Sequence, residues 1–194
     1  NQLRQVLKHY HDAGGQNPLI VFIAEADYQL YEPAGAWPDS LIPIVIEELA
    51  SVGMDVWLGA LAYGAKSVLL IDAGSVPEGV QLALKEQLGF ARSLLDGMQY
   101  DDDLIQYIAV DKDSAKASIA DLQTQDLPAM PDITLATFGG SNSKRQAMFM
   151  AIDHLNAQTG NVQEEILLPA NAPFGRIQVD ASRCTMCMGC TSVC

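Results

Sequence analysis

Short apolar runs alternate with amphipathic stretches along most of the chain. Residues 18–24 (PLIVFIA), 67–72 (SVLLID) and 104–110 (LIQYIAV) are continuous apolar runs bounded by turn-forming residues. Such runs are typical of strands that are buried on both faces of a sheet. Residues 41–49 and 133–137 (ITLAT) predict two further strands.

The stretches between these runs have the spacing of helices. Leu3, Val6, Leu7 and Tyr10 occur at i, i+3, i+4 and i+7, which predicts a helix over 1–13. Further helices are predicted at 54–63, 77–97, 113–122 and 143–157. Alternating strands and helices indicate parallel βαβ units. We therefore expect an α/β domain over 1–160, with an open, mostly parallel sheet and helices on both faces in a three-layer α/β/α arrangement.

The character of the chain changes after Gly160. Residues 161–174 are rich in Pro and small residues and are predicted to be a linker, with one short strand at 165–168. Residues 175–180 (GRIQVD) alternate like a strand and lead directly into a cysteine run. We expect 175–194 to be the beginning of a ferredoxin-like segment.

All four cysteines of the chain lie in this run, at Cys184, Cys187, Cys190 and Cys194. The spacing C-x2-C-x2-C-x3-C is typical of the ligands of a bacterial-type 4Fe-4S cluster. In such runs the first three cysteines bind one cluster and the fourth binds another. We therefore expect the chain on its own to hold the 4Fe-4S cluster loosely or not at all, with a poorly ordered C-terminus.

Other metal sites are less well supported by the sequence. Structural zinc sites usually have two separated ligand pairs, whereas these cysteines form one run. The three histidines are far from it in sequence, and the acidic run 101–103 is expected to be a solvated loop. Met186 and Met188, between the cysteines, are expected to pack against a cluster rather than to coordinate it.

A weaker candidate site lies where the last predicted strand meets the last helix. Gly139, Gly140, Ser141 and Lys144 form a glycine turn with a nearby cation, which could bind an anion or a cofactor phosphate. The turn fits neither G-x-G-x-x-G nor G-x-x-x-x-G-K-[ST]. A glycine turn in which Ser141 or Asn142 caps the helix is the simpler interpretation, and we favour it over an anion site.

Composition limits the partners. The net charge of −13 disfavours nucleic acid and anionic membranes as ligands but suits a basic redox partner. No apolar stretch reaches the roughly 18 to 20 residues that span a bilayer, so no membrane insertion is expected. Cluster thiolates must stay reduced, which indicates the cytoplasm. Because the chain begins at Asn1, within a predicted helix, we expect it to be part of a longer protein; the oligomeric state is left open, a homo-oligomer included.

Two resemblances to known families follow from these residues. Leu168 to Cys194 resembles the beginning of the paired ferredoxin motifs of large bacterial iron-sulfur cluster-binding proteins, which have a second cysteine run further on. Residues 18–110 are similar to the delta subunit of methyl-viologen-reducing hydrogenase, an electron-transfer protein. That family carries cluster cysteines at positions that align near Ala50 and Ala73, and residues 1–183 contain no cysteine. The second resemblance implies a domain that has kept the fold of that family but has lost its iron-sulfur cluster. The role of such a domain would be docking or assembly.

Three functions remain as hypotheses. The first is an iron-sulfur electron-transfer protein whose α/β domain docks a redox partner protein, a component of an oxidoreductase complex rather than a self-contained enzyme. The second is an interaction or assembly domain in which the cluster only holds parts of the fold together. We call this the stapling role. The third is a flavin- or nucleotide-binding oxidoreductase domain that uses the Gly139 turn. No motif of a hydrolase is present.

Overall fold

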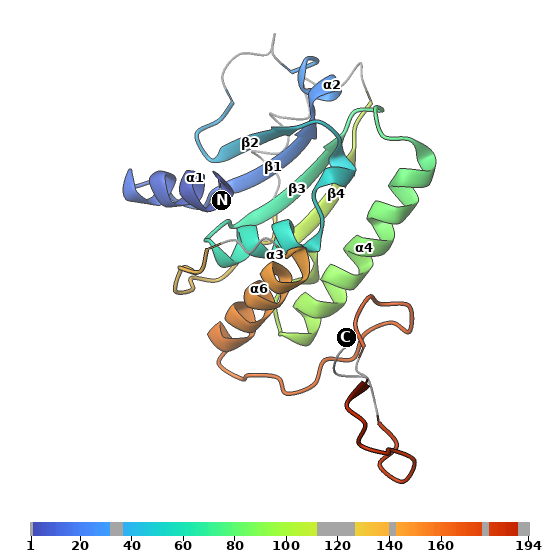
Figure 1. Cartoon of the computed structure of the whole chain (residues 1–194). Coiled ribbons are helices and arrows are strands. Elements are labelled where there is room, and N and C mark those ends of the chain that lie inside the picture. Colours follow the sequence, from blue (N-terminus) through green and yellow to red (C-terminus); the bar gives the residue numbers. More distant parts are fainter. Residues whose placement is uncertain (1, 32–36, 112–126, 140–142, 176–178, 190–194) are drawn as a thin grey trace.

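A four-stranded, all-parallel sheet forms the centre of the protein. The computed structural model describes residues 2–31, 37–111, 127–139, 143–175 and 179–189. The strands are β1 (Leu19–Ala24), β2 (Leu41–Ile46), β3 (Ser67–Asp72) and β4 (Ile105–Ala109). They lie side by side in the order β2-β1-β3-β4 (Figure 1). The expected open α/β fold with a parallel sheet is confirmed.

The two central strands are buried on both faces, as their uninterrupted apolar sequences predict. In register, Phe22 of β1 lies beside Leu70 of β3, and Ile23 lies beside Ile71. Phe22 and Leu70 belong to the main core cluster, whereas Ile23 and Ile71 belong to a second cluster. Successive residues of a strand point to opposite faces, so one apolar run supplies two cores.

Helices surround this sheet (Figure 1). The main core contains residues of α1 (Gln2–Asp12), α3 (Met54–Ala62), α4 (Glu78–Gly97) and α6 (Lys144–Gln158). The short helix α2 (Glu25–Tyr28) contributes Tyr28 to the second core. Two 3-10 turns, η2 (Leu49–Ser51) and η3 (Asp102–Leu104), precede α3 and β4. None of the described helices combines the length and apolarity needed to cross a bilayer.

Three predicted strands differ from the structure. The strand predicted over 41–49 ends at Ile46, and η2 follows. The segment 133–137 is not a strand, because its polar backbone groups bond to helices: Ala136 N–H donates to the Ala62 carbonyl over 2.8 Å, and Thr134 N–H donates to the Gln158 side chain over 3.0 Å. The segment 165–168 pairs with no strand among the described residues and packs on the core instead.

Several other predictions lie partly or wholly outside the described residues. These are the helix 113–122 and the central residues 176–178 of the strand predicted over 175–180; Gly175, Val179 and Asp180 are not in a strand. Ser141 and Asn142, the expected caps of the last helix, also lie outside them. The side chain of Ser143 caps α6, accepting from Gln146 N–H over 3.4 Å.

Candidate functional site

The first part of the cysteine run, with Cys184 and Cys187, lies on an arm that projects from the domain (Figure 1). We call residues 179–189 the cysteine arm; every one of them is exposed. Cys184 and Cys187 are free, exposed thiols on this arm. Cys190 and Cys194 lie outside the described residues. Among the described residues, no three His, Cys, Asp or Glu side chains come together as a metal site.

A hydrogen-bonded turn leads the chain into the first cysteine. The Asp180 carboxylate accepts from the Ser182 N–H over 2.9 Å and from the Ser182 hydroxyl over 2.6 Å. Arg183 N–H donates to the Asp180 carbonyl over 3.1 Å. These bonds to Ser182 lower the pKa of the Asp180 carboxyl group. Asp180 therefore fixes the direction in which the chain enters at Cys184.

Around the two thiols, the backbone turns its N–H groups toward sulfur. Met186 N–H donates to Cys184 Sγ over 3.4 Å. The N–H of Gly189, and then the hydroxyl of Thr185, lower the pKa of the Cys187 thiol. Met186 and Met188 have φ angles of 51° and 60°, which lie in the left-handed region. This conformation lets the backbone reverse its direction within a few residues. Their side chains are 82% and 66% exposed.

This local geometry fits an iron-sulfur cluster. Cluster ligands are thiolates, and hydrogen bonds to sulfur help to set a cluster's reduction potential. Cys184 and Cys187 are exposed, and donors beside Cys187 favour its thiolate. In the intact site, Cys184, Cys187 and Cys190 would hold one 4Fe-4S cluster, with Cys194 directed to a second. A bound cluster would accept and release single electrons.

The arm is joined to the domain by a segment that packs on the core. We call residues 161–174 the connecting segment. Ile166, Leu168, Ala172 and Phe174 contact the main core. Phe174 meets Phe149 of α6 edge-on with ring centroids 6.1 Å apart, and Asn171 donates to Glu86 of α4 over 2.5 Å. The connecting segment thus holds the chain at a fixed place on the α/β domain as far as Phe174.

Gly97, at the end of α4, makes this attachment testable. A Cβ atom at Gly97 would lie 2.3 Å from Ile166 Cγ2, whereas one at Gly89 of the same helix would contact nothing. We expect Gly97→Ala to displace Ile166 and to lower the free energy of unfolding by about 1 to 2 kcal/mol. We expect Gly89→Ala to raise it by about 0.5 to 1 kcal/mol, because alanine favours helix.

Urea unfolding of both variants, with hydrogen exchange of the connecting segment, measures the two effects. Faster exchange of the connecting segment in Gly97→Ala alone is the expected pattern. Equal stabilisation by both alanines would mean that Ile166 does not occupy this place.

The weaker candidate at the Gly139 turn is only partly described. Gly140 and Ser141 lie outside the described residues. Lys144 and Arg145 line a cavity of about 520 Å³ between the starts of α3 and α6, and Gly139 is not among its lining residues. Asp55 and Glu86 carboxylates line the same cavity and offset the two cations. The described residues therefore do not assemble an anion site around Gly139.

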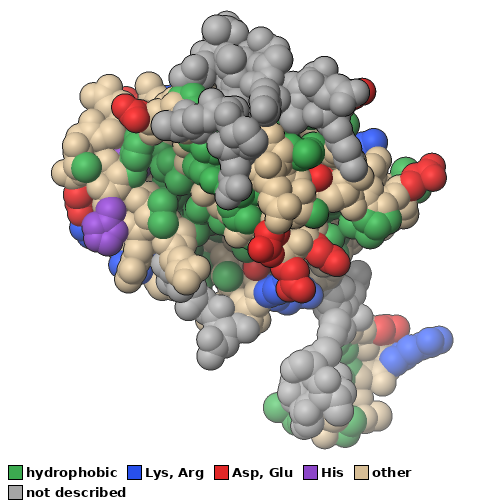
Figure 2. Space-filling view, turned by 90° about the horizontal axis from the view of Figure 1, so that it is seen from above, with side chains coloured by type: hydrophobic (Ala, Val, Ile, Leu, Met, Phe, Trp, Pro, Cys, Tyr) green, Lys and Arg blue, Asp and Glu red, His purple; other side chains and the backbone are tan. Residues whose placement is uncertain are grey.

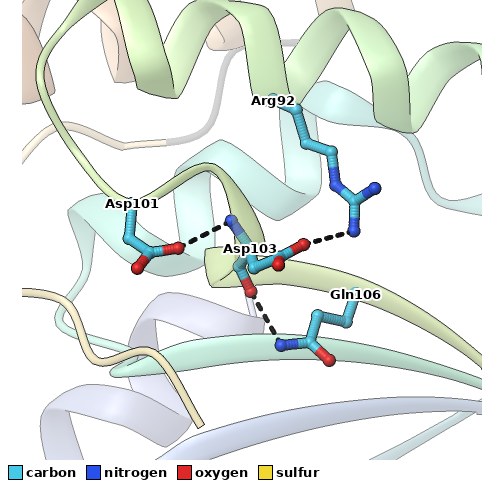
Figure 3. A network of polar contacts seen from close by, with 4 residues as sticks. All are labelled: Arg92, Asp101, Asp103 and Gln106. Atoms are coloured by element: carbon cyan, nitrogen blue, oxygen red, sulfur yellow. Dashed lines mark hydrogen bonds and ion pairs between the residues drawn. The ribbon is translucent and has the colours of Figure 1, made fainter.

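The acidic run 101–103 forms a capped turn (Figure 3). The Asp101 carboxylate accepts from Asp103 N–H over 2.9 Å, and Arg92 of α4 pairs with the Asp103 carboxylate over 2.6 Å. The Gln106 side chain donates to the Asp103 carbonyl over 3.0 Å. The exposed carboxylates of Asp101 and Asp103 thus bond to the backbone of the turn and to Arg92, which agrees with the prediction of a solvated loop.

Two histidines contact backbone carbonyls of neighbouring segments, and one of them, His154, contacts the segment 130–138. His11 lies 3.2 Å from the Gly64 carbonyl, and His154 lies 2.8 Å from the Thr134 carbonyl. Both contacts join helices to neighbouring backbone.

A site that sequence reasoning missed lies at the carboxyl edge of the sheet. Asp27 and Asp72 are each only 2% exposed; Asp27 lies three residues after the end of β1, and Asp72 is the last residue of β3. Asp27 Oδ2 accepts from Ala73 N–H over 2.9 Å and from the Ser75 hydroxyl over 2.8 Å. The two carboxylates thus hold the loop after β3 from both sides. Acidic residues at or shortly after the ends of these two apolar runs were the signal in the sequence.

Asp72 accepts four hydrogen bonds. Gly74 N–H and Val76 N–H donate to Oδ1 over 2.8 and 3.3 Å, and the Gln81 side chain donates to Oδ2 over 3.1 Å. The Tyr107 hydroxyl of β4 also donates to Oδ2. Burial, and then the bond to Asp72, raises the pKa of Tyr107. Tyr107 therefore remains a donor throughout the neutral and mildly alkaline range.

The position of this edge in the topology is distinctive. The chain leaves β1 toward β2 on one side and returns to β3 on the other, so the strand order reverses between β1 and β3. In open α/β sheets, ligands bind outside the carboxyl ends of strands at such a point. Ala50 and Ala73, the positions aligned with cysteines of the hydrogenase subunit family, both lie at this edge.

Comparison with known proteins does not assign a family. No protein-family model matches the chain, and no curated protein matches it.

Proposed function

We propose that this chain is part of an iron-sulfur electron-transfer protein. Its cysteine run binds a 4Fe-4S cluster, and its α/β domain docks a redox partner. The observation that carries the proposal is the C-x2-C-x2-C-x3-C run on an exposed arm, where Met186 N–H points at Cys184 Sγ. The resemblance of residues 168–194 to the beginning of paired ferredoxin motifs supports the same function.

Exposure of the arm favours electron transfer over a purely stapling role. A cluster that staples a fold would be expected to tie together elements of its core. Here Ile166, Leu168, Ala172 and Phe174 already attach the connecting segment to the domain, and the cysteine arm beyond them is exposed. An exposed cluster is also accessible to a partner, which electron transfer requires.

A flavin or nucleotide site receives no comparable support. Phosphate-binding loops of doubly wound folds lie after the first strand and are rich in glycine. Here Glu25 and Asp27 follow β1 directly. Two carboxylates at that place disfavour a phosphate by like-charge repulsion.

Anaerobic reconstitution tests the proposal. The chain is treated with ferric iron and sulfide in the presence of an excess of a small thiol, which reduces part of the iron to the ferrous state and can supply an iron ligand that the run does not. We expect the visible absorption of a 4Fe-4S cluster, reversible bleaching on reduction and the electron paramagnetic resonance signal of the reduced cluster. Uptake of zinc but not of iron and sulfide would contradict cluster binding. A cluster that cannot be reduced reversibly would contradict electron transfer and favour the stapling role.

A further inference from the structure

A small cavity opens at the carboxyl edge, between the ends of β1 and β2 and the loop after β3. Its volume is about 260 Å³. This is below the range of about 300 to 1,000 Å³ that is usual for sites of drug-sized ligands. The cavity is thus suited to a single side chain rather than to a dinucleotide or a flavin.

The walls of this cavity are apolar and short. They are formed by residues from β1, α2, η2 and the start of α4: Ala24, Ala26, Ala50, Val76, Pro77 and Val80. Walls of this kind pack well against the methylene groups of a long side chain.

The polar groups of the lining side chains are all acceptors. Glu47 and Glu48 line the cavity and are exposed, and neither pairs with a cation among the described residues. Ser75 also lines it and donates its hydroxyl proton to Asp27, so its remaining lone pairs can accept a hydrogen bond. An apolar cavity with carboxylates and a hydroxyl acceptor suits a cation on an alkyl stem.

Some of the backbone N–H groups around the cavity are already used. Pro77 has no N–H. Val76 N–H donates to Asp72, and Val80 N–H donates to the Pro77 carbonyl. An anionic ligand would meet two carboxylates, whereas a guanidinium group would find acceptors.

We propose that this cavity receives an arginine or lysine side chain of a basic partner protein. Figure 2 looks down on this end of the molecule and shows acidic side chains gathered there beside apolar ones. The net charge of −13 would attract a basic protein over a distance, and a buried arginine is a common anchor of interfaces. The inference rests on the part of the proposed function that assigns partner docking to the α/β domain; it does not require the cysteine arm to hold a cluster.

Nuclear magnetic resonance titration of the cluster-free chain tests this inference separately from cluster binding. The probe is N-acetyl-arginine methylamide, and its neutral match is N-acetyl-citrulline methylamide. We expect the arginine probe to shift the signals of Ala24, Ala26 and Ala50, and the citrulline probe to leave them unchanged. Agmatine tests the free small molecule. Binding of agmatine more than about tenfold tighter than the arginine probe would identify a metabolite site and overturn the docking role.

Two variants separate the cavity from general charge attraction. Glu47→Gln with Glu48→Gln is expected to weaken binding of the arginine probe by at least about tenfold. Glu164→Gln with Glu165→Gln, an exposed pair on the connecting segment, removes the same charge and should leave binding unchanged. Equal weakening by both double variants would overturn the proposal.

A third variant fills the cavity without changing any charge. Ala50→Leu is expected to block the arginine probe, because Ala50 forms part of the wall. Unchanged amide signals away from η2 would verify that this variant is folded. Undiminished binding by a folded Ala50→Leu variant would place the cation outside the cavity and contradict the proposal.

Discussion

Serine in place of Cys184, Cys187 or Cys190 is expected to abolish the 4Fe-4S cluster in reconstituted protein. Serine has nearly the size of cysteine but lacks the soft thiolate that iron-sulfur clusters require. Each of the three is predicted to bind the same cluster, so losing one should be as damaging as losing another. Loss of visible absorption, with iron and sulfide contents near the background of the unreconstituted chain, measures the effect.

Cys194→Ser is the matched control for these three variants. The spacing assigns Cys194 to a different cluster, so this change should leave the reconstituted absorption in place. Because Cys184 and Cys187 lie on the exposed cysteine arm, replacing either of them should not alter the urea unfolding of the α/β domain. Equal loss of cluster in the Cys194→Ser variant would show that all four cysteines serve one site.

Local sequence patterns were sufficient to predict the buried strands and the long helices. Residues 67–72 form β3 as expected, because an apolar run between Gly64 and Gly74 has few alternatives to a buried strand. Pro77 precedes α4, where its missing N–H costs nothing. The helix α2 was missed because four residues are too few to show a helical period.

The segments that were predicted wrongly owe their structure to tertiary contacts, which a local sequence pattern does not show. The sequence ITLAT at 133–137 has the composition of a strand, but the end of α3 and the side chain of Gln158 take its backbone hydrogen bonds. In 165–168, Ile166 and Leu168 face the core while Leu167 is 94% exposed. The alternation of apolar and exposed positions was present, but within the described part of the chain no strand lies beside this segment to pair with it.

The candidate sites differ in how much of them the sequence contains. Cysteine spacing within eleven residues is a local property, so candidate cluster ligands can be named directly from the sequence. The bond between Asp27 and Ser75 joins residues 48 positions apart, and it depends on β1 and β3 being neighbours. Strand order is a property of the whole fold, so the carboxyl-edge cavity could not be derived from local patterns.

Asp72→Ala is expected to lower the free energy of unfolding by about 3 kcal/mol or more. The change removes an acceptor that is 2% exposed and leaves its donors without it. Gly74 N–H can reach water, and the Gln81 side chain keeps its bond to the Val76 carbonyl over 3.0 Å. The Val76 N–H is buried and the Tyr107 hydroxyl is partly buried, so these two donors are the costly ones to leave without an acceptor. Urea-induced unfolding at neutral pH measures the loss.

Two comparisons identify the acceptor role of Asp72. Asp72→Asn keeps one oxygen for the loop N–H groups but presents an NH₂ donor to Gln81 or Tyr107, so we expect about half the loss of the alanine variant. Asp102→Ala removes an exposed carboxylate from η3 and should change stability by less than about 0.5 kcal/mol. If Asp72→Ala cost no more than Asp102→Ala, the network around Asp72 would not hold the loop after β3. That loop forms one wall of the proposed docking cavity, so Asp72→Ala should also weaken binding of the arginine probe.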